Sequence, residues 1–155
     1  MTAKRKRRSG RIRVREITNS DYDEMVALQE LCGLQLEKKI RESRKAIARQ
    51  LRFNPGLSFA AFDRARMVAV ARGSYDARRG YIDRVAVHPD YRRQGLGTKL
   101  VSRVEKALWT RGGRYIVVSA LVHTDNESSR TMFEKLGFET VPVLYMRKRP
   151  PQRSR

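Results

Sequence analysis

The sequence predicts one α/β domain of the α+β kind, in which helices flank a mixed, mostly antiparallel sheet. The first observation is the order of patterns along the chain: strand, two helices, three strands, helix, strand, helix, strands. The second is the helix expected between the fourth and fifth strands, because such a crossover makes those two strands parallel. The third is the length, since 155 residues suit a single hydrophobic core.

The N-terminal third is expected to hold a strand and two helices. Residues 12–18 alternate apolar and charged side chains, as in a half-buried strand. Asp21, with Glu24 three residues later, predicts a capping pair at the start of the first helix. A second, highly charged helix is predicted over residues 38–53, and Asn54-Pro55-Gly56 ends it. The inner faces of the two helices are expected to hold Met25, Leu28, Leu31 and Cys32, and Ile40, Ala46, Ile47 and Leu51.

The middle of the chain is expected to form a meander of three strands. Their predicted ranges are 58–62, 67–75 and 81–87, with turns at 63–66 and 76–80. Because these turns are short, neighbouring strands are expected to pair antiparallel.

The C-terminal half is expected to add two helices and further strands. Apolar residues at a spacing of 3.6 predict a helix from Leu96 to about Trp109. Residues 115–122 are almost all apolar, which predicts a central, buried strand. A last helix is predicted between Asp125-Asn126 and Gly137, and residues 138–148 predict one or two final strands, broken at Pro142.

The net charge of +19 is concentrated at the two ends of the chain. Eight cations lie in residues 1–15, which hold no acid, and five lie in residues 147–155. We therefore expect a disordered basic tail at 1–11, a folded domain at 12–148 and a basic C-terminal tail at 149–155. Such tails predict weak binding to nucleic acid or another polyanion.

Composition excludes several other classes of protein. No apolar run approaches the roughly 20 residues of a membrane span, so no membrane partner is expected. Cys32 is the one cysteine, so no internal disulfide can form, and a cytoplasmic protein is expected. No cluster of His, Cys, Asp and Glu has metal-ligand spacing, so no metal is expected.

Residues 81–108 hold the most specific pattern. A strand pattern stops at His88-Pro89, and a basic loop with Gly95 and Gly97 then opens into a helix. The first N–H groups of a helix lack internal partners and carry partial positive charge, so this arrangement favours an anion. The loop matches neither G-x-x-x-x-G-K-[ST] nor G-x-G-x-x-G, which excludes a nucleotide P-loop and a dinucleotide-binding turn.

The segments VAVHPDYRRQGLG, at residues 85–97, and NESSRTMFEKLGF, at residues 126–138, are specific in combination. Together with the element order, this chain resembles the GNAT superfamily of acetyl-coenzyme-A-dependent N-acetyltransferases, of the small stand-alone bacterial type. The resemblance covers nearly all of residues 12–148. It implies the GNAT fold, with a splayed parallel pair of fourth and fifth strands, and acetyl-coenzyme A as cosubstrate.

The resemblance also implies which residues hold the coenzyme. The amides of residues 93–98 would bind its pyrophosphate, and the fourth strand would pair with its pantetheine arm. The implied coenzyme-binding residues are Val85, Ala86, Val87, Arg92, Arg93, Gln94, Gly95, Leu96, Gly97, Thr98, Asn126 and Arg130. Lys99 and Arg103 are further candidates for the adenosine phosphate, although helix cations are often merely solvated.

The catalytic groups are less well defined by the sequence. Strict alternation would place Tyr81, Asp83, Val85 and Val87 on one face of the fourth strand. Asp83 is the first candidate for the base, acting through water, and Tyr81 is the second; a salt bridge and a core ring are their structural alternatives. Many members of the family use a helix tyrosine as the acid for the leaving thiolate, but the matching residue here is Phe133.

The predicted function is transfer of an acetyl group to a primary amine, by direct attack in a ternary complex. The acceptor is a protein or a small molecule, and its channel is expected between Leu31–Glu42 and Val141–Met146. The alternative is an acyl-coenzyme-A-binding or nucleic-acid-associated module with weak or no catalysis, which Phe133 favours slightly. A homodimer joined through the final strands is a further expectation.

Overall fold

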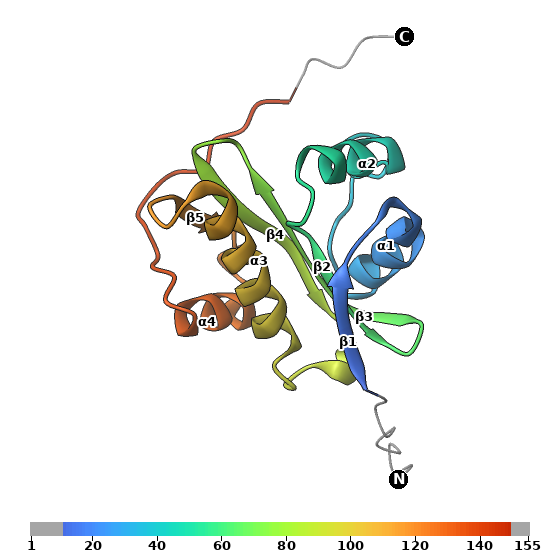
Figure 1. The fold of residues 1–155 in the computed structure, drawn as a ribbon. Helices are drawn as coiled ribbons and strands as arrows, with labels where there is room; N and C mark the ends of the chain where they lie inside the picture. The colour runs from blue at the N-terminus through green and yellow to red at the C-terminus, as the bar shows by residue number, and fades with distance from the viewer. Residues whose placement is uncertain (1–10, 150–155) are drawn as a thin grey trace.

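The computed structural model describes residues 11–149 as a five-stranded sheet with helices on both faces (Figure 1). The elements are β1 (Ile12–Glu16), the short 3-10 helix η1 (Asn19–Asp21), α1 (Tyr22–Leu31), α2 (Arg44–Phe53), β2 (Phe59–Asp63), β3 (Arg66–Tyr75), β4 (Arg79–Val87), η2 (Pro89–Tyr91), α3 (Leu96–Gly112), β5 (Val117–Ala120) and α4 (Glu127–Lys135). Most of the two predicted tails, at residues 1–10 and 150–155, lies outside the described residues.

The strands lie in the order β1-β2-β3-β4-β5, and the pairs β1–β2, β2–β3 and β3–β4 are antiparallel. β4 and β5 are parallel, as the α3 crossover between them requires. α1 and α2 lie on one face of the sheet, and α3 and α4 lie on the other (Figure 1). The predicted fold class is confirmed: a mixed, mostly antiparallel sheet with flanking helices and one parallel pair.

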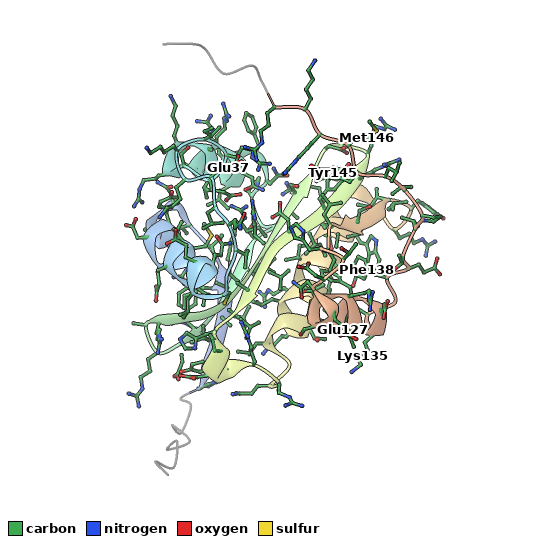
Figure 2. The ribbon with its side chains drawn as sticks, turned by 180° about the vertical axis from the view of Figure 1, so that it is seen from behind. Glu37, Glu127, Lys135, Phe138, Tyr145 and Met146 are labelled. Atoms are coloured by element: carbon green, nitrogen blue, oxygen red, sulfur yellow. The ribbon has the colours of Figure 1, made fainter. Side chains whose placement is uncertain are left out.

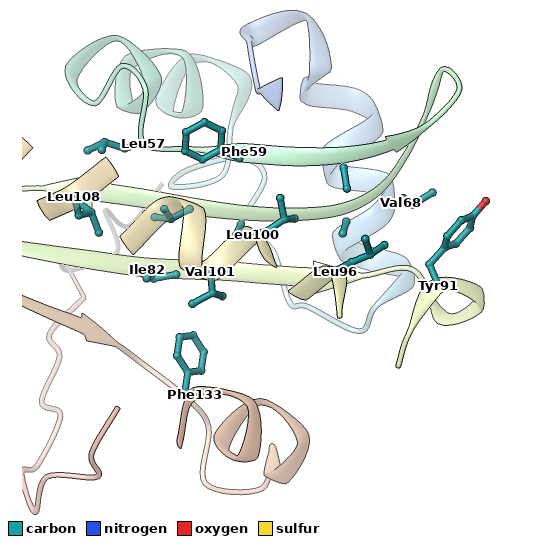
Figure 3. Close-up of a cluster of buried hydrophobic side chains, with 14 residues drawn as sticks. Leu57, Phe59, Val68, Ile82, Tyr91, Leu96, Leu100, Val101, Leu108 and Phe133 are labelled. Carbon is teal, nitrogen blue, oxygen red and sulfur yellow. The ribbon is translucent and has the colours of Figure 1, made fainter. Parts of the chain in front are cut away.

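The larger core lies between the sheet and α3 (Figure 3). Leu100, Val101, Val104 and Leu108 recur at helical spacing and are fully buried against β2, β3 and β4. Burying each such side chain contributes about 1.5–3 kcal/mol relative to leaving it in water. Phe133 of α4 joins the same core. This stripe therefore fixes α3, and with it the start of that helix, against the sheet.

The second helix is shorter than the sequence predicts. α2 begins at Arg44, because Ser43 Oγ accepts a hydrogen bond from an N–H of the first turn at 3.2 Å and caps the helix there. Residues 38–43 form turns instead of helix. Ile40 and Leu31, both expected on inner faces, are exposed, because the chain leaves its helical path between them.

The prediction of a central, buried strand at residues 115–122 is wrong. β5 has four residues and lies at the sheet edge, with Val117 exposed on it and Leu121 exposed just beyond. The final strands predicted at residues 138–148 do not form within the described part of the chain. Pro142 offers no N–H to a ladder, and an apolar run does not reveal whether a neighbouring strand covers it.

A capping box precedes α1, one turn earlier than predicted. The carboxylate of Asp21 accepts a hydrogen bond from the N–H of Thr18 at 2.8 Å and two from Arg15, at 2.7 and 2.8 Å. Glu24, the predicted partner of Asp21, instead accepts a hydrogen bond from the N–H of Met67 at 2.6 Å. Asp21 thus ties the start of α1 to β1, and Glu24 ties α1 to β3.

Asp21→Asn is expected to lower the free energy of unfolding at pH 7 by about 1–2 kcal/mol, because the amide cannot replace charge-assisted hydrogen bonds. The hydrogen bond from Arg15 holds the pKa of Asp21 below its usual value, aided by the N–H of Thr18. The contribution is therefore present above the unfolded-state pKa of about 3.9 and is lost as the pH falls through the lowered folded pKa.

Urea unfolding of both proteins, at pH 7 and near pH 2, measures this effect. Asp23→Asn is the control, because Asp23 is exposed and makes a single surface ion pair with Arg44. Equal losses in the two variants, or a loss from Asp21→Asn that is as large in acid as at pH 7, would contradict the assignment.

Candidate active site

β4 and β5 are paired at one end only. Their parallel register joins Arg79–Ile82 to Val117–Ala120 and stops there. Arg84, two residues further along β4, has a φ of 53°, in the left-handed region that arginine rarely adopts. Asp83 pairs with Arg72 and Ala86 pairs with Val70, so β4 has one more residue than β3 between these two pairs. Arg84 therefore lies in a β-bulge, beyond which β4 separates from β5 and leaves a wedge between them.

The bulge divides the residues that strict alternation placed on one face. Val85 and Val87 pack against the core on the α3 side, whereas Ala86 belongs to the core on the α1 side. Asp83, before the bulge, faces the α1 and α2 side, as does Tyr81 by alternation. The prediction of a shared face for all four residues is wrong, because one extra residue reverses the alternation.

The backbone of Val87 points into the wedge. The N–H of His88 donates to the carbonyl of Val68 on β3 at 2.8 Å, so the N–H of Val87, one residue earlier, points away from β3. The carbonyl of Val87 accepts hydrogen bonds from Arg92 Nε at 3.1 Å and from Cys32 Sγ at 3.2 Å. The edge of β4 beyond the bulge thus turns its backbone groups toward the wedge.

The wedge leads to a loop that forms an anion cradle at the start of α3. Arg93 and Gly95 are both left-handed, with φ values of 60° and 74°. The first helical hydrogen bond runs from the N–H of Lys99 to the carbonyl of Gly95 at 2.9 Å. The six N–H groups of residues 93–98 donate no backbone hydrogen bond to any described residue. These amides and the helix dipole together favour a bound anion.

Close packing holds the cradle in place. A Cβ added at Gly97 would lie 3.0 Å from Met132 Sδ and 3.5 Å from Val87 Cγ2, so the start of α3 lies against both α4 and β4. His88 is buried, and its Nδ1 accepts a hydrogen bond from the N–H of Asp90 at 3.1 Å, which fixes η2. Among the predicted loop residues, those that are exposed are Arg92, Arg93, Gln94, Gly95 and Thr98, and those that are buried are Leu96 and Gly97.

α4 brings two predicted residues to the cradle side of the molecule, since Met132 touches the start of α3. Asn126 caps α4, with its Oδ1 accepting a hydrogen bond from the N–H of Ser129 at 3.1 Å. Arg130 is exposed and lies 3.8 Å from Glu134. Arg103, by contrast, lies over the ring of Phe59 at 4.8 Å, on the β2 side of α3.

Phe133 is a core residue. Its ring is buried and makes an edge-to-face contact with Phe138 at 5.0 Å between centroids. The position where relatives carry an acid for the thiolate is thus filled here by a phenyl ring that has no proton to give.

A buried polar cluster lies beneath the bulge, on the α1 and α2 side. Glu42 accepts hydrogen bonds from Arg84 Nε at 3.0 Å and from Arg72 Nη2 at 3.2 Å. Its second oxygen lies 3.0 Å from Arg72 Nη1. The sequence offered a salt bridge to an arginine such as Arg84 or Arg72 as the structural alternative for Asp83, and missed that Glu42 contacts both arginines. An arginine inside the apolar run of β3 was the signal that a buried acid must exist.

Asp83 lies at the edge of this cluster. Its Oδ1 is buried and 3.5 Å from Arg72 Nε, while its side chain as a whole is 46% exposed, which leaves Oδ2 on the solvent side. Burial raises the pKa of Asp83 above the ordinary range, and Arg72 and Arg84 oppose that rise. Tyr81 is half-buried, and its hydroxyl donates to Asp76 Oδ2 at 3.3 Å.

The two segments predicted to bound an acceptor channel lie side by side. Glu37, in the loop between α1 and α2, lies 3.1 Å from Arg149 Nη2 of the C-terminal segment. Figure 2 shows Tyr145 and Met146 of that segment near the same end of the molecule as Glu37. These contacts bring the loop after α1 and the chain after α4 to one side of β4.

Residues 11–149 contain neither a cluster of metal-ligand side chains nor a membrane-spanning helix. No group of three or more His, Cys, Asp or Glu side chains there could hold a metal ion. No helix of that part is long and apolar enough to cross a membrane.

Solved structures of acetyltransferases share the fold of this chain. PaiA N-acetyltransferase of Thermoplasma acidophilum, in complex with coenzyme A, superposes with a TM-score of 0.72 at 17% identity, over 85% of this chain and 92% of that one. The ribosomal-protein-S18-alanine N-acetyltransferase of Escherichia coli gives 0.68 at 22% identity, over 84% and 79%.

Sequence relatives then define the family. The model of the acetyltransferase (GNAT) family matches residues 14–138. An acetyltransferase of Yersinia enterocolitica is 33% identical over 136 residues, which are 88% of this chain and 94% of that relative. The chain therefore belongs to the GNAT family: it is an acetyltransferase, and acetyl-coenzyme A is its cosubstrate. The resemblance drawn from residues 85–97 and 126–138 is confirmed.

Proposed function

We propose that this enzyme transfers the acetyl group to a primary amine by direct attack within a ternary complex. One observation carries the proposal: the part of β4 that β5 leaves unpaired runs from Asp83, whose side chain is partly exposed, to the loop at the start of α3, where six N–H groups have no described backbone partner. Acetyl-coenzyme A supplies a thioester at one side of the wedge between β4 and β5, and the amine enters from the other. The acceptor is a protein N-terminus, a lysine or a small amine.

The residues of the cradle fit a pyrophosphate. Six convergent N–H groups, from Arg93 to Thr98, would bind its oxygens, and Arg92 and Arg93 would add positive charge. Gly97 lets the first turn of α3 pack closely on α4, because a side chain there would meet Met132. The strand edge at residues 85–87 would pair with the pantetheine arm, and Asn126 and Arg130 would flank it.

Three tasks then fall to residues of β4 and its surroundings. The N–H of Val87, which points away from β3, would polarise the thioester carbonyl. Asp83 would take the proton of the attacking amine through a water molecule at Oδ2, and its raised pKa makes it a stronger base than an ordinary carboxylate. Tyr81 is the second candidate, but its hydroxyl already donates to Asp76.

A different function remains as the second candidate, because Phe133 is buried and carries no acid. In that reading the protein binds an acyl-coenzyme A without turning it over. Thiol release from acetyl-coenzyme A with a panel of amines distinguishes the two. Turnover of any amine at a rate above its uncatalysed acetylation supports the enzyme, and tight coenzyme binding without turnover on the whole panel supports the binding module.

A homodimer stays a prediction. The outer edge of β5 pairs with no strand among the described residues, and Val143 and Tyr145 beyond α4 are exposed. Sedimentation equilibrium of the full chain gives the molar mass that decides it.

Gly95→Ala is expected to weaken coenzyme A binding about tenfold, because an alanine resists the left-handed conformation that aims the cradle amides. Gly113→Ala is the matched control. Gly113, just after the other end of α3, also has a positive φ, of 81°, but with a ψ of 160°, and neither added Cβ would meet an atom within 4 Å. Both variants should lose stability, and Gly113→Ala should lose more, because its conformation is almost restricted to glycine. Calorimetric titration with coenzyme A decides: equal affinities in the two variants would remove the cradle from the site.

Asp83→Asn is expected to lower kcat/KM for the best amine about 10²–10⁴-fold, the usual contribution of a general base. The base must be unprotonated, so the wild-type kcat/KM should fall as the pH drops through a pKa above the ordinary carboxyl range. This fall on the acid side of the pH profile is called the acid limb. The variant should lose the acid limb while keeping its affinity for coenzyme A. Tyr81→Phe should retain the limb. A limb that persists in Asp83→Asn would exclude Asp83 as the base.

A further inference from the structure

Glu42 ends the loop between α1 and α2, and its side chain is only 7% exposed. It holds two guanidinium groups at once, from neighbouring strands: Arg72 of β3, which is 3% exposed, and Arg84 of β4. Desolvating such a cluster is unfavourable unless its geometry is well satisfied, and buried ionic groups are often kept because they fix one arrangement.

We propose that Glu42 is a positioning residue of the acetyl-transfer site, which fixes the bulge at Arg84 and keeps Arg72 from pairing closely with Asp83. The inference rests on the proposed function, in which Asp83 receives the proton. Glu42 itself reaches neither the cradle nor the exposed oxygen of Asp83, so it acts through the two arginines.

The first part of the argument concerns the backbone of Arg84. A left-handed φ of 53° is unfavourable for a residue with a Cβ, so something must hold it there. Arg84 Nε and Nη2 lie 3.0 and 2.9 Å from the same oxygen of Glu42. These two contacts hold the guanidinium against Glu42, on the α1 and α2 side of the strand. If Arg84 relaxed to an extended conformation, residues 85–87 would turn over.

The second part concerns the direction of Arg72. Its two Nη atoms lie 3.0 and 3.2 Å from Glu42, which leaves only Nε toward Asp83, at 3.5 Å. A bidentate pair between Arg72 and Asp83 would tie up both carboxylate oxygens. Because Glu42 contacts both Nη atoms of Arg72, Oδ2 of Asp83 stays available to water and substrate.

The third part concerns the loop that carries Glu42. The hydroxyl of Tyr22 donates to the carbonyl of Glu42 at 2.7 Å, and the N–H of Glu42 donates to the carbonyl of Glu37 at 3.1 Å. Both ends of the residue are therefore held, the side chain by the sheet and the backbone by α1 and the loop. Glu42 thus links the segment beside the acceptor to the strand that faces the thioester.

Glu42→Gln keeps the shape of the side chain and removes its charge. The charged groups that face Asp83 are Arg72 from β3, Arg84 from β4 and Glu42 from the loop; Gln29 is the nearby polar residue of α1. With the charge of Glu42 gone, both arginines favour ionised Asp83. The acid limb of kcat/KM should therefore move to lower pH by about half a unit or more. The limiting kcat should fall, since a weaker base accepts the proton.

A purely structural role would lower stability and kcat without moving the limb. Glu30→Gln is the control, because Glu30 ends α1 beside the same loop and makes an exposed ion pair with Lys38 at 2.6 Å. The control should keep the wild-type limb. An unmoved limb in Glu42→Gln overturns the inference, provided that Asp83→Asn abolishes the limb. If Asp83→Asn keeps it, the base assignment fails instead.

A second pair of variants tests the bulge even if Glu42→Gln does not fold. Arg84→Gly and Arg84→Ala both remove the guanidinium, but only glycine accepts a φ of 53° without strain. Coenzyme A should bind Arg84→Ala about fivefold more weakly than Arg84→Gly, because the alanine lets the bulge relax. Wild-type affinity in Arg84→Ala, measured by calorimetric titration, would show that the side chain of Arg84 does not hold the bulge, which overturns the inference.

Discussion

The left-handed backbone at Arg84 is the constraint on which the site depends. Such a residue costs about 1–3 kcal/mol, so it persists only where the surrounding structure holds it. Its consequences are geometric: the bulge follows the last residue paired with β5, Ile82, leaves the backbone N–H of Val87 pointing away from β3, and places Asp83 on the opposite face from Val85 and Val87. One residue out of register therefore separates the thioester side of the proposed site from the base side, while keeping both on the same strand.

For the proposed cradle, selectivity would come from the direction of its N–H groups and not from net charge. A chain with a net charge of +19 attracts any anion, and that attraction is screened by salt. Six amides that converge at the start of α3 act differently, because their positions are fixed by a buried helix and by left-handed residues at Arg93 and Gly95. The buried stripe of α3 thus serves the site as much as the fold, since it sets where the first turn begins.

The sequence predicts most of the fold and names the residues of the candidate site, but not all of their contacts. Periodicity located the strands around residues 12–18 and 81–87 and the helix from Leu96, because each pattern depends on local burial. It failed at residues 115–122, where burial depends on a neighbouring strand that the described chain does not supply. The prediction of strict alternation also failed after Arg84, because no residue type or spacing in the sequence marks a bulge. The partnership of Glu42 with two arginines joins residues 30 and 42 positions apart, which no local pattern encodes.

The lack of an acid at Phe133 slows the proposed reaction only a little. A thiol has a pKa of about 8.5, whereas an alkyl ammonium such as that of lysine has one of about 10.4. The thiolate is therefore the better leaving group, and it can depart at neutral pH without being protonated as it leaves. The protein must therefore assist mainly the attacking amine, whose ammonium form must lose its proton first. In the proposed reaction the carboxylate of Asp83, with one oxygen buried, would accept that proton, and the position of Phe133 would need no acid.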